Sequence, residues 1–339
     1  MNISEEKKFK DITTFRVGGK IKYFIEVKDE EGVGEAIHFA KKNSLPIFMV
    51  GEGSDFLAED NMYEGVVIKY LGDSLEFTPE GSKVLVTAES GLKWDKLVEE
   101  TVKNELQGLE CLSGIPGTVG GAPIQNIGAY GQEISDTFYS LKAYDIENEK
   151  YKSFSKDECE FGYRDSIFKN EKFWQKYFIL QVTLVLNKNK IAKVNYDSLK
   201  AIVGEEAELS EIRQAVLKTR QDKLEDPKKV GNAGSFFKNP IVDVQKKENL
   251  EKMFPGIKTF PYGDKFKVSA AWLIEMAGWK GKGFGEAAVS PKHSLILINK
   301  TGSAPANDIY TLSEMIVNDV FEKYGIKLEK EVQLINFSK

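Results

Sequence analysis

The chain has 339 residues, 41% hydrophobic and 29% charged, which is typical of a folded globular protein of two or three domains. Its net charge of −5 excludes the electrostatic footprint of a nucleic-acid-binding protein. Two cysteines and two histidines are too few for a disulfide framework or a zinc-like cluster, so we expect no bound metal. No apolar leader or membrane-spanning run is present. We therefore predict a cytoplasmic protein without a membrane partner.

Taken in chain order, the apolar pattern predicts alternating strands and helices. We expect strands over 46–50, 66–68, 84–88 and 179–186, a helix over 94–102, and a helix capped by Ser210 and stopped by Pro227. A second α/β portion follows, with a helix over 270–277 capped by Ser269, a strand over 294–299, a helix from Ile309 that finishes at Gly325, and a last strand over 331–337.

The most informative segment is the run over residues 108–131, which carries glycine or proline every few positions and almost no charge. Glycine tolerates positive φ and proline fixes turns, so this run is not a regular helix or strand. Its leucines, isoleucines and valine are unlike a surface linker. An irregular, apolar, glycine-dense run can present bare backbone N–H groups to a large, flat, partly anionic ligand. The alternative is a buried crossover loop.

A second glycine segment, Gly51-Glu52-Gly53-Ser54, follows the strand over 46–50. As a dinucleotide fingerprint it is weak, because the third glycine is missing and no helix clearly follows. As a tight turn facing a phosphate it is plausible, and the chain has no P-loop motif. The two glycine segments together point to one extended nucleotide cofactor held at two places.

Three polar residues stand out, each with an ordinary alternative. Arg164 lies in a Tyr-Arg-Asp-Ser sequence, where a surface ion pair is the common fate of an arginine. Ser235 lies between Gly234 and two phenylalanines. Its side chain is either a polar hydroxyl in a hydrophobic setting or an ordinary turn hydroxyl that has a hydrogen-bond partner. Glu331 begins the last predicted strand, where a carboxylate is usually solvated.

Together these segments resemble the UDP-N-acetylenolpyruvoylglucosamine reductase family. The resemblance runs nearly end to end, through residues 14–19, 51–54, 113–131, 162–166 and 231–240 and the terminal Glu331-Val332. It implies an α+β chain with the FAD-binding fold of the vanillyl-alcohol-oxidase type. Two α/β subdomains, 1–73 with 328–339 and 74–218, would surround the flavin, and a third α+β domain, 219–327, would bind substrate. Tyr196 matches the tyrosine of the loop found in the longer subclass.

By position in these motifs, the resemblance implies roles for individual residues. Arg164 is the active-site arginine, Ser235 the proton-donating serine and Glu331 the active-site glutamate. The residues that contact FAD are Gly51, Gly53, Ser54, Asp55, Ser113, Ile115, Pro116, Gly117, Gly121, Ala122, Asn126, Gly128, Ala129, Tyr130 and Gly131. Those that contact substrate are Tyr196, Lys223 and Asn239. The family commonly has asparagine where this chain has Asp55, which adds negative charge near the expected pyrophosphate.

The resemblance also implies the reaction: NADPH reduces FAD, which reduces the enolpyruvyl group of UDP-N-acetylglucosamine enolpyruvate to give UDP-N-acetylmuramate for peptidoglycan. Relatives of this fold often attach flavin covalently through a histidine, but neither His38 nor His293 lies in a glycine segment, so we expect non-covalent FAD. We interpret His293 as part of a surface turn, with the edge of the substrate pocket as the alternative. We expect a monomer. Two alternatives are an oxidase of the same architecture that passes electrons to oxygen, and a non-catalytic sensor of a flavin or nucleotide sugar.

Overall fold

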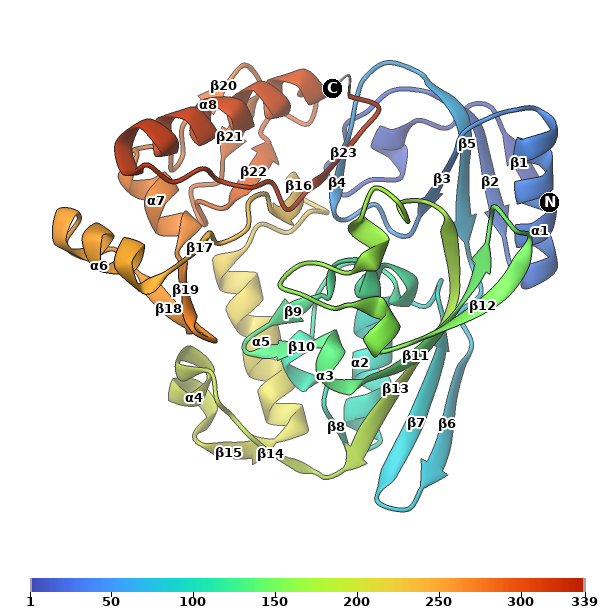
Figure 1. Ribbon diagram of the computed structural model, residues 1–339, viewed down its shortest axis with the longest axis horizontal. Coiled ribbons are helices and arrows are strands. Elements are labelled where there is room, and N and C mark those ends of the chain that lie inside the picture. Colours follow the sequence, from blue (N-terminus) through green and yellow to red (C-terminus); the bar gives the residue numbers. More distant parts are fainter. Residues whose placement is uncertain (1, 338–339) are drawn as a thin grey trace. The chain divides into compact units, whose positions relative to one another are not determined.

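The structure is a computed structural model that describes residues 2–337 (Figure 1). These residues form two compact units: unit 1 comprises 2–7, 21–52 and 64–222, and unit 2 comprises 8–20, 53–63 and 223–337. The three-part division implied by the resemblance stays a prediction, and residues 1, 338 and 339 of its first part lie outside the described residues.

Unit 1 holds two main sheets and their helices (Figure 1). Its strands are β1 (Asn2–Ser4), β2 (Ile21–Val27), β3 (Ile47–Val50), β5 (Tyr63–Tyr70, whose first residue belongs to unit 2), β6 (Leu75–Glu80), β7 (Lys83–Glu89), β8 (Leu106–Gln107), β9 (Gly128–Ala129), β10 (Gln132–Glu133), β11 (Phe138–Asp145), β12 (Lys150–Ser155), β13 (Tyr177–Lys188), β14 (Ile191–Lys193) and β15 (Glu206–Glu208). Its helices are α1 (Glu30–Lys42), α2 (Trp94–Lys103), α3 (Ile134–Thr137), α4 (Asp197–Val203) and α5 (Leu209–Lys223, whose last residue belongs to unit 2).

The first sheet has the order β1-β2-β5-β3, and α1 links β2 to β3. Strands β3 and β5 are parallel, with Ile47 opposite Val66. The Asp29 side chain caps α1 by accepting the Gly32 N–H at 2.8 Å. The apolar face of α1, which includes Ile37, is buried with the inner side chains of β2 and β5.

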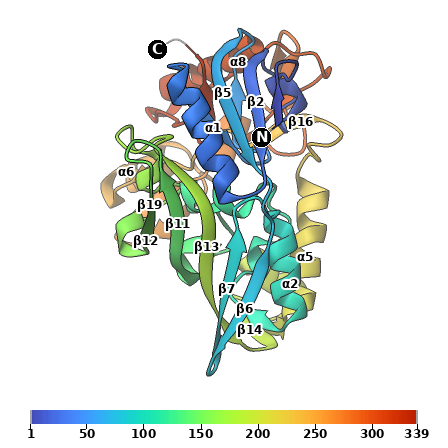
Figure 2. The same ribbon diagram turned by 90° about the vertical axis from the view of Figure 1, so that its right-hand side faces the viewer.

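The second sheet has the order β12-β11-β13-β7-β6, and β8 also pairs with β13. The long β13 lies between β7 and β11 (Figure 2), in antiparallel register with Leu184 opposite Val86. Leu97 and Val98 of α2 are buried with this sheet in one core. The Trp94 indole N–H donates to the Leu112 carbonyl at 3.0 Å, which ties α2 to the glycine-rich run.

Unit 2 packs short strands and helices around its own core (Figure 1). Its elements are β4 (Phe56–Ala58), β16 (Gly231–Ser235), β17 (Ile241–Val242), α6 (Val244–Met253), β18 (Thr259–Tyr262), β19 (Lys265–Val268), α7 (Ala270–Met276), β20 (Gly283–Phe284), β21 (Ala287–Val289), β22 (Ile296–Asn299), α8 (Ala306–Tyr324) and β23 (Gln333–Ile335). The sheet β16-β22-β21-β20, together with α7 and α8, encloses this core, and β23 pairs in parallel with β4. Phe236 and Phe237 are fully buried in it.

The predicted elements are present, with corrections at several of their ends: α7 ends at Met276, and β22 begins at Ile296. Ser269 caps α7 by accepting the Trp272 N–H, and Gly325 ends α8 in the left-handed conformation, as predicted. The prediction for Ser210 was wrong: α5 already begins at Leu209, and the Glu211 carboxylate accepts the Glu208 N–H at 3.0 Å at this end. The last strand is shorter than predicted, since β23 starts at Gln333. Of residues 2–337, no helix combines the length and the apolar character that crossing a membrane requires.

Both cysteines are free and buried. Burial raises the pKa of Cys111 and Cys159 to about 12, with smaller contributions from Glu110 and Glu158. Since the thiolate is the reactive form, both thiols should resist modification.

We predict that the folded protein does not react with Ellman's reagent at pH 8, whereas the chain unfolded in denaturant releases two equivalents of chromophore. Rapid reaction of either thiol in the folded protein would contradict this burial.

Candidate active site

Gly51 and Glu52, the first half of the second glycine segment, contact the glycine-rich run within unit 1. A Cβ atom on Gly51 would lie only 2.6 Å from the Thr118 Oγ1 atom, so this position requires glycine. The Glu52 carboxylate accepts the Gly117 N–H at 3.3 Å and lies 3.4 Å from the Lys93 ammonium. The protein itself therefore uses the Gly117 N–H, and the turn after β3 is fixed against the glycine-rich run.

The glycine-rich run is irregular, as predicted, with a 3-10 turn over Val119–Gln125. Six of its residues have positive φ: Gly108 at 138°, Gly114 at 71°, Gly117 at 133°, Asn126 at 47°, Tyr130 at 50° and Gly131 at 83°. Left-handed backbone is unfavourable for residues with a Cβ, and it persists only where surrounding contacts hold it. Contacts with surrounding residues therefore hold the backbone of this run in a defined conformation.

One side of this run is packed and the other is open. A Cβ on Gly120 would lie 2.5 Å from the Ser90 Cβ, whereas one on Gly121 would meet only the Thr118 Oγ1 at 3.9 Å. Gly121 and Gly131 are exposed, while Val119 is buried. Val119 thus belongs to the core and Gly120 packs against Ser90, whereas the backbone at Gly121 and Gly131 is open. This arrangement fits a large, flat group such as a flavin nucleotide lying against the backbone.

Arg164 lies against this run. Its Nη2 donates to the Gly128 carbonyl at 2.6 Å, and its Nη1 lies 3.9 Å from the Glu133 carboxylate. Arg164 itself has a φ of 53°, and only 19% of its side chain is exposed. The Asn126 amide donates to Glu133 at 2.7 Å and to the Gly162 carbonyl at 3.0 Å. The guanidinium is therefore anchored on the predicted cofactor loop, where it also faces the Glu133 carboxylate.

Tyr196, the predicted substrate contact, also lies beside this loop. Its ring packs edge to face on Tyr130, with ring centres 5.4 Å apart. Burial raises the pKa of Tyr130, and the nearby positive charge of Arg220 partly opposes this rise. Tyr196 immediately precedes α4 and remains 43% exposed. Within unit 1, the structure therefore brings Arg164, Tyr130 and Tyr196 to one run of backbone.

In unit 2, Ser235 and Glu331 lie on adjacent segments. Ser235 ends β16 opposite Ile296, and the next residue, Phe236, accepts the Glu331 N–H at 2.8 Å through its carbonyl. Phe237 forms an antiparallel bridge with Lys330. Residues more than ninety positions apart in sequence are thus adjacent in space. Gly234, with a φ of 73° and open space around its Cα, precedes the serine.

Several further predicted contacts also lie in unit 2. Gly53 has a φ of 64°, and its carbonyl accepts the Thr14 N–H at 2.9 Å, while the Asp55 carbonyl accepts the Gln333 N–H at 3.1 Å. Ser54 lies between them. The Asn239 side chain accepts the Ala270 N–H at 2.9 Å, at the start of α7.

Lys223, the last residue of α5, is exposed and lies in the electrostatic environment of His293. His293 lies in a turn that precedes β22, as predicted, and its Nδ1 accepts the Leu295 N–H at 3.3 Å. Its ring is half-buried, and burial, followed by the charge of Lys280, lowers the pKa of this histidine. Residues 2–337 contain no group of His, Cys, Asp or Glu side chains suited to a metal ion.

Sequence reasoning missed the side chains that hold the glycine-rich run. Glu110 is buried, accepts the Gly108 N–H at 2.7 Å and accepts from the Gln132 amide at 2.7 Å. Gln132 in turn accepts the Cys111 N–H at 2.9 Å. The two ends of the run are thereby tied together. The signal was present in the sequence, because Glu110 is an isolated carboxylate in an otherwise apolar stretch.

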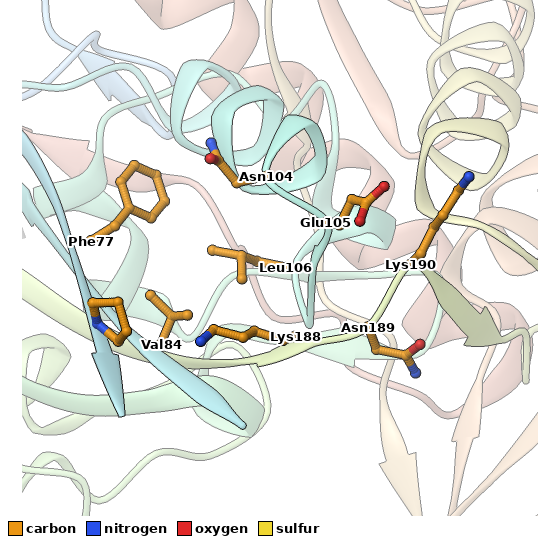
Figure 3. A pocket seen from close by; sticks show the side chains of 9 residues that line it. Phe77, Val84, Asn104, Glu105, Leu106, Lys188, Asn189 and Lys190 are labelled. Atoms are coloured by element: carbon orange, nitrogen blue, oxygen red, sulfur yellow. The ribbon is translucent and has the colours of Figure 1, made fainter. Parts of the chain in front are cut away.

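A surface pocket of about 390 Å³ lies elsewhere on unit 1 (Figure 3). Phe77, Val84 and Leu106 line it together with polar residues such as Glu105 and Lys188. None of the residues predicted for cofactor, substrate or catalysis lines this pocket. It is therefore separate from the candidate active site.

Comparisons with known proteins match both parts of the chain. Residues 21–153 match an FAD binding domain, and residues 226–335 match the C-terminal domain of UDP-N-acetylenolpyruvoylglucosamine reductase. The reductase of that name from Pseudomonas putida is 38% identical over 97% of this chain and 98% of its own length. The one from Flavobacterium johnsoniae is 39% identical over 99% of this chain and its own full length.

The crystal structure of UDP-N-acetylenolpyruvylglucosamine reductase from Thermus caldophilus has the same fold, with a TM-score of 0.70 at 24% identity over 99% of both chains. The matched domain and the fold define an FAD-binding flavoprotein and confirm the predicted fold class. With its identity to the curated relatives along almost the whole length, the chain belongs to the UDP-N-acetylenolpyruvoylglucosamine reductase family.

The contact between Arg164 and Gly128 is open to a direct test. A Cβ on Gly128 would lie 2.8 Å from the Arg164 Nη1 and 2.9 Å from the Gln132 carbonyl oxygen. We predict that Gly128→Ala displaces the guanidinium and lowers the steady-state rate with the family's substrate roughly 10- to 100-fold. Gly34→Ala in α1, where a Cβ would meet nothing within 4 Å, is the control and should keep the wild-type rate. Wild-type turnover by a folded Gly128→Ala protein would show that the position of Arg164 does not matter.

Proposed function

We propose that this protein uses NADPH and FAD to reduce the enolpyruvyl group of UDP-N-acetylglucosamine enolpyruvate, giving UDP-N-acetylmuramate for peptidoglycan precursor synthesis. Membership in the reductase family and the match to an FAD binding domain support this reaction. The single observation that carries the proposal is the anchoring of Arg164 on the Gly128 carbonyl, because it joins a predicted catalytic cation to the predicted cofactor loop.

The glycine-rich run and the turn after β3 would hold FAD. The open backbone at Gly121 and Gly131 suits close approach of a planar ring, and the close contact of Gly51 with Thr118 joins the two segments. The resemblance also assigns Gly53, Ser54 and Asp55 and the other loop residues to FAD. FAD would be held without a covalent bond. When bound, it supplies the hydride, taken from NADPH, that adds to the terminal carbon of the enol ether.

Arg164 would stabilise the charge that hydride addition places on the substrate. Negative charge develops on the carbon beside the substrate carboxylate and spreads into it as an enolate. A guanidinium can grip a carboxylate with two hydrogen bonds, and in a site shielded from water such a contact is strong. Its partial burial and its contacts with Gly128 and Glu133 support a fixed orientation.

Ser235 would deliver the proton that completes the reduction. A serine is a weak acid in water, but an enolate carbon is basic enough to accept its proton when the two are positioned together. Glu331 would donate or relay a second hydrogen bond to the developing charge. Its placement beside Phe236 in the backbone pairing supports a shared site with Ser235.

Tyr196, Lys223 and Asn239 would bind the nucleotide part of the substrate, with Lys223 reaching the diphosphate. The contact of Tyr196 with Tyr130 supports a substrate loop next to the cofactor loop. The proposal includes a monomeric protein of the bacterial cytoplasm. Two free, buried thiols suit such a reducing compartment.

The reaction predicts a defined substrate dependence. The purified protein should be yellow and should oxidise NADPH at a catalytic rate only when the enolpyruvyl sugar nucleotide is present, as followed at 340 nm under nitrogen. Under air without this substrate, NADPH oxidation should stay slow. Rapid oxygen consumption without the sugar nucleotide would instead identify an oxidase, and flavin binding with no turnover of the sugar nucleotide would identify a sensor.

The proposed role of Ser235 predicts a separation of the two half-reactions. Ser235→Ala should lower kcat by roughly 10²- to 10⁴-fold, because the proton donor acts in the second half-reaction, with little change in the KM of the sugar nucleotide. In stopped-flow measurements, NADPH should bleach the flavin at the wild-type rate. A variant with near-normal turnover, or one whose flavin is reduced slowly, would contradict this role.

A further inference from the structure

One residue of the glycine-rich run, Gly114, is held from both sides by helix side chains. The Gly114 N–H donates to the Asp95 carboxylate at 2.6 Å, and the Gly114 carbonyl accepts from the Arg220 Nε at 3.1 Å. Asp95 lies in the first turn of α2, and Arg220 lies near the end of α5. Both polar atoms of this residue are therefore fixed by side chains outside the run.

Asp95 is itself oriented by a second arginine of α5. The Arg213 guanidinium makes a two-pronged contact with it, at 2.6 Å from Nη1 to Oδ1 and 2.9 Å from Nη2 to Oδ2. Burial alone would raise the pKa of the Asp95 carboxyl, but the hydrogen bonds from Arg213 and Gly114 outweigh it and lower this pKa. The carboxylate that receives the Gly114 N–H therefore stays charged near neutral pH.

A side chain at position 114 would strain the backbone and crowd α5. The φ of Gly114 is 71°, and a Cβ would lie 2.8 Å from the Leu217 Cδ2 and 3.4 Å from Arg220. Arg213, Leu217 and Arg220 are spaced by four and three residues, so they share one face of α5. Asp95 at the start of α2, with Arg213 and Arg220 on this face of α5, therefore surrounds Gly114, and we call these three residues the clamp.

The clamp lies at the start of the segment assigned to the cofactor. Gly114 is flanked by Ser113 and Ile115, and Pro116 and Gly117 follow. An ion pair that served only to join α2 to α5 would be complete with Asp95 and Arg213 alone. Here the same carboxylate oxygen that contacts Arg213 also accepts the loop N–H at 2.6 Å. The contact between α2 and α5 therefore includes the backbone of the loop.

We propose that Asp95, oriented by Arg213 and assisted by Arg220, is a positioning residue that presets the Ser113–Gly117 backbone for FAD. The inference rests on the proposed role of this segment in holding FAD. A preset loop loses less conformational entropy when the ligand binds, so the clamp acts on FAD affinity. It touches neither substrate nor the reacting atoms, and it should leave the chemical steps of the loaded enzyme intact.

The test is the affinity of the full-length apoprotein for FAD, measured by quenching of flavin fluorescence. Asp95→Asn keeps the shape of the side chain but loses the charge, and it should raise the Kd for FAD about tenfold or more. Glu100→Gln is the matched control, because this carboxylate lies on the same helix and forms ion pairs with Lys96 and Lys103 of that helix. It should leave the Kd unchanged.

A second variant separates positioning from folding. Arg213→Lys keeps the positive charge but cannot make the two-pronged contact, so it should weaken FAD binding by a smaller factor than Asp95→Asn. At saturating FAD, both variants should keep the wild-type KM for the sugar nucleotide and the wild-type rate of flavin reduction by NADPH. If the Asp95→Asn apoprotein does not fold, Arg213→Lys carries the test.

The outcomes decide between the alternatives. If wild type and both clamp variants bind FAD with the same Kd, the inference is overturned. The clamp then serves only to pack α2 against α5, even if the variants have a lower melting temperature. If the variants bind FAD more weakly but the wild-type protein does not turn over the sugar nucleotide, the role of the clamp is upheld and the proposed reaction is refuted. A wild-type apoprotein that binds no FAD would overturn the clamp as well.

Discussion

The conformation of the glycine-rich run depends on side chains that form hydrogen bonds with it. Left-handed backbone at several positions has an energetic cost that only surrounding contacts can offset. Glu110 with Gln132 closes the ends of the run, Asp95 and Arg220 hold Gly114, and Glu133 holds Asn126. Without these contacts the glycines would leave the segment flexible, and its open backbone would not form a defined surface.

The same contacts connect the fold of unit 1 to its chemistry. The carbonyl that receives Arg164 belongs to Gly128, whose position follows from the turn at Asn126 and the pairing of β9 with β10. The arginine also has a left-handed backbone, so its side chain is directed by both its own main chain and its acceptor. A cation held at two points undergoes little reorganisation when charge develops nearby.

Much of the fold could be predicted from the sequence because the apolar periodicity of strands such as β13 and helices such as α8 is strong. The glycine segments and the resemblance identified Arg164, Ser235 and Glu331, but their roles stay predictions. Periodicity could not show that Glu211 rather than Ser210 acts at the start of α5, since both are polar residues of one turn. The partners of Gly114 could not be predicted either, because Asp95 is more than a hundred residues from Arg213 and only the tertiary fold joins them. Two arginines seven residues apart on α5 were the available clue.

Three residues with side chains, Asn126, Tyr130 and Arg164, occupy backbone conformations that glycine adopts with less strain. Replacing any of them by glycine would relieve local strain while removing a contact of the site. Selection for heat resistance alone could therefore favour variants that erode activity at these positions. In a directed-evolution experiment, the loop would be a place where improved thermal tolerance and retained function compete, and both would have to be screened together.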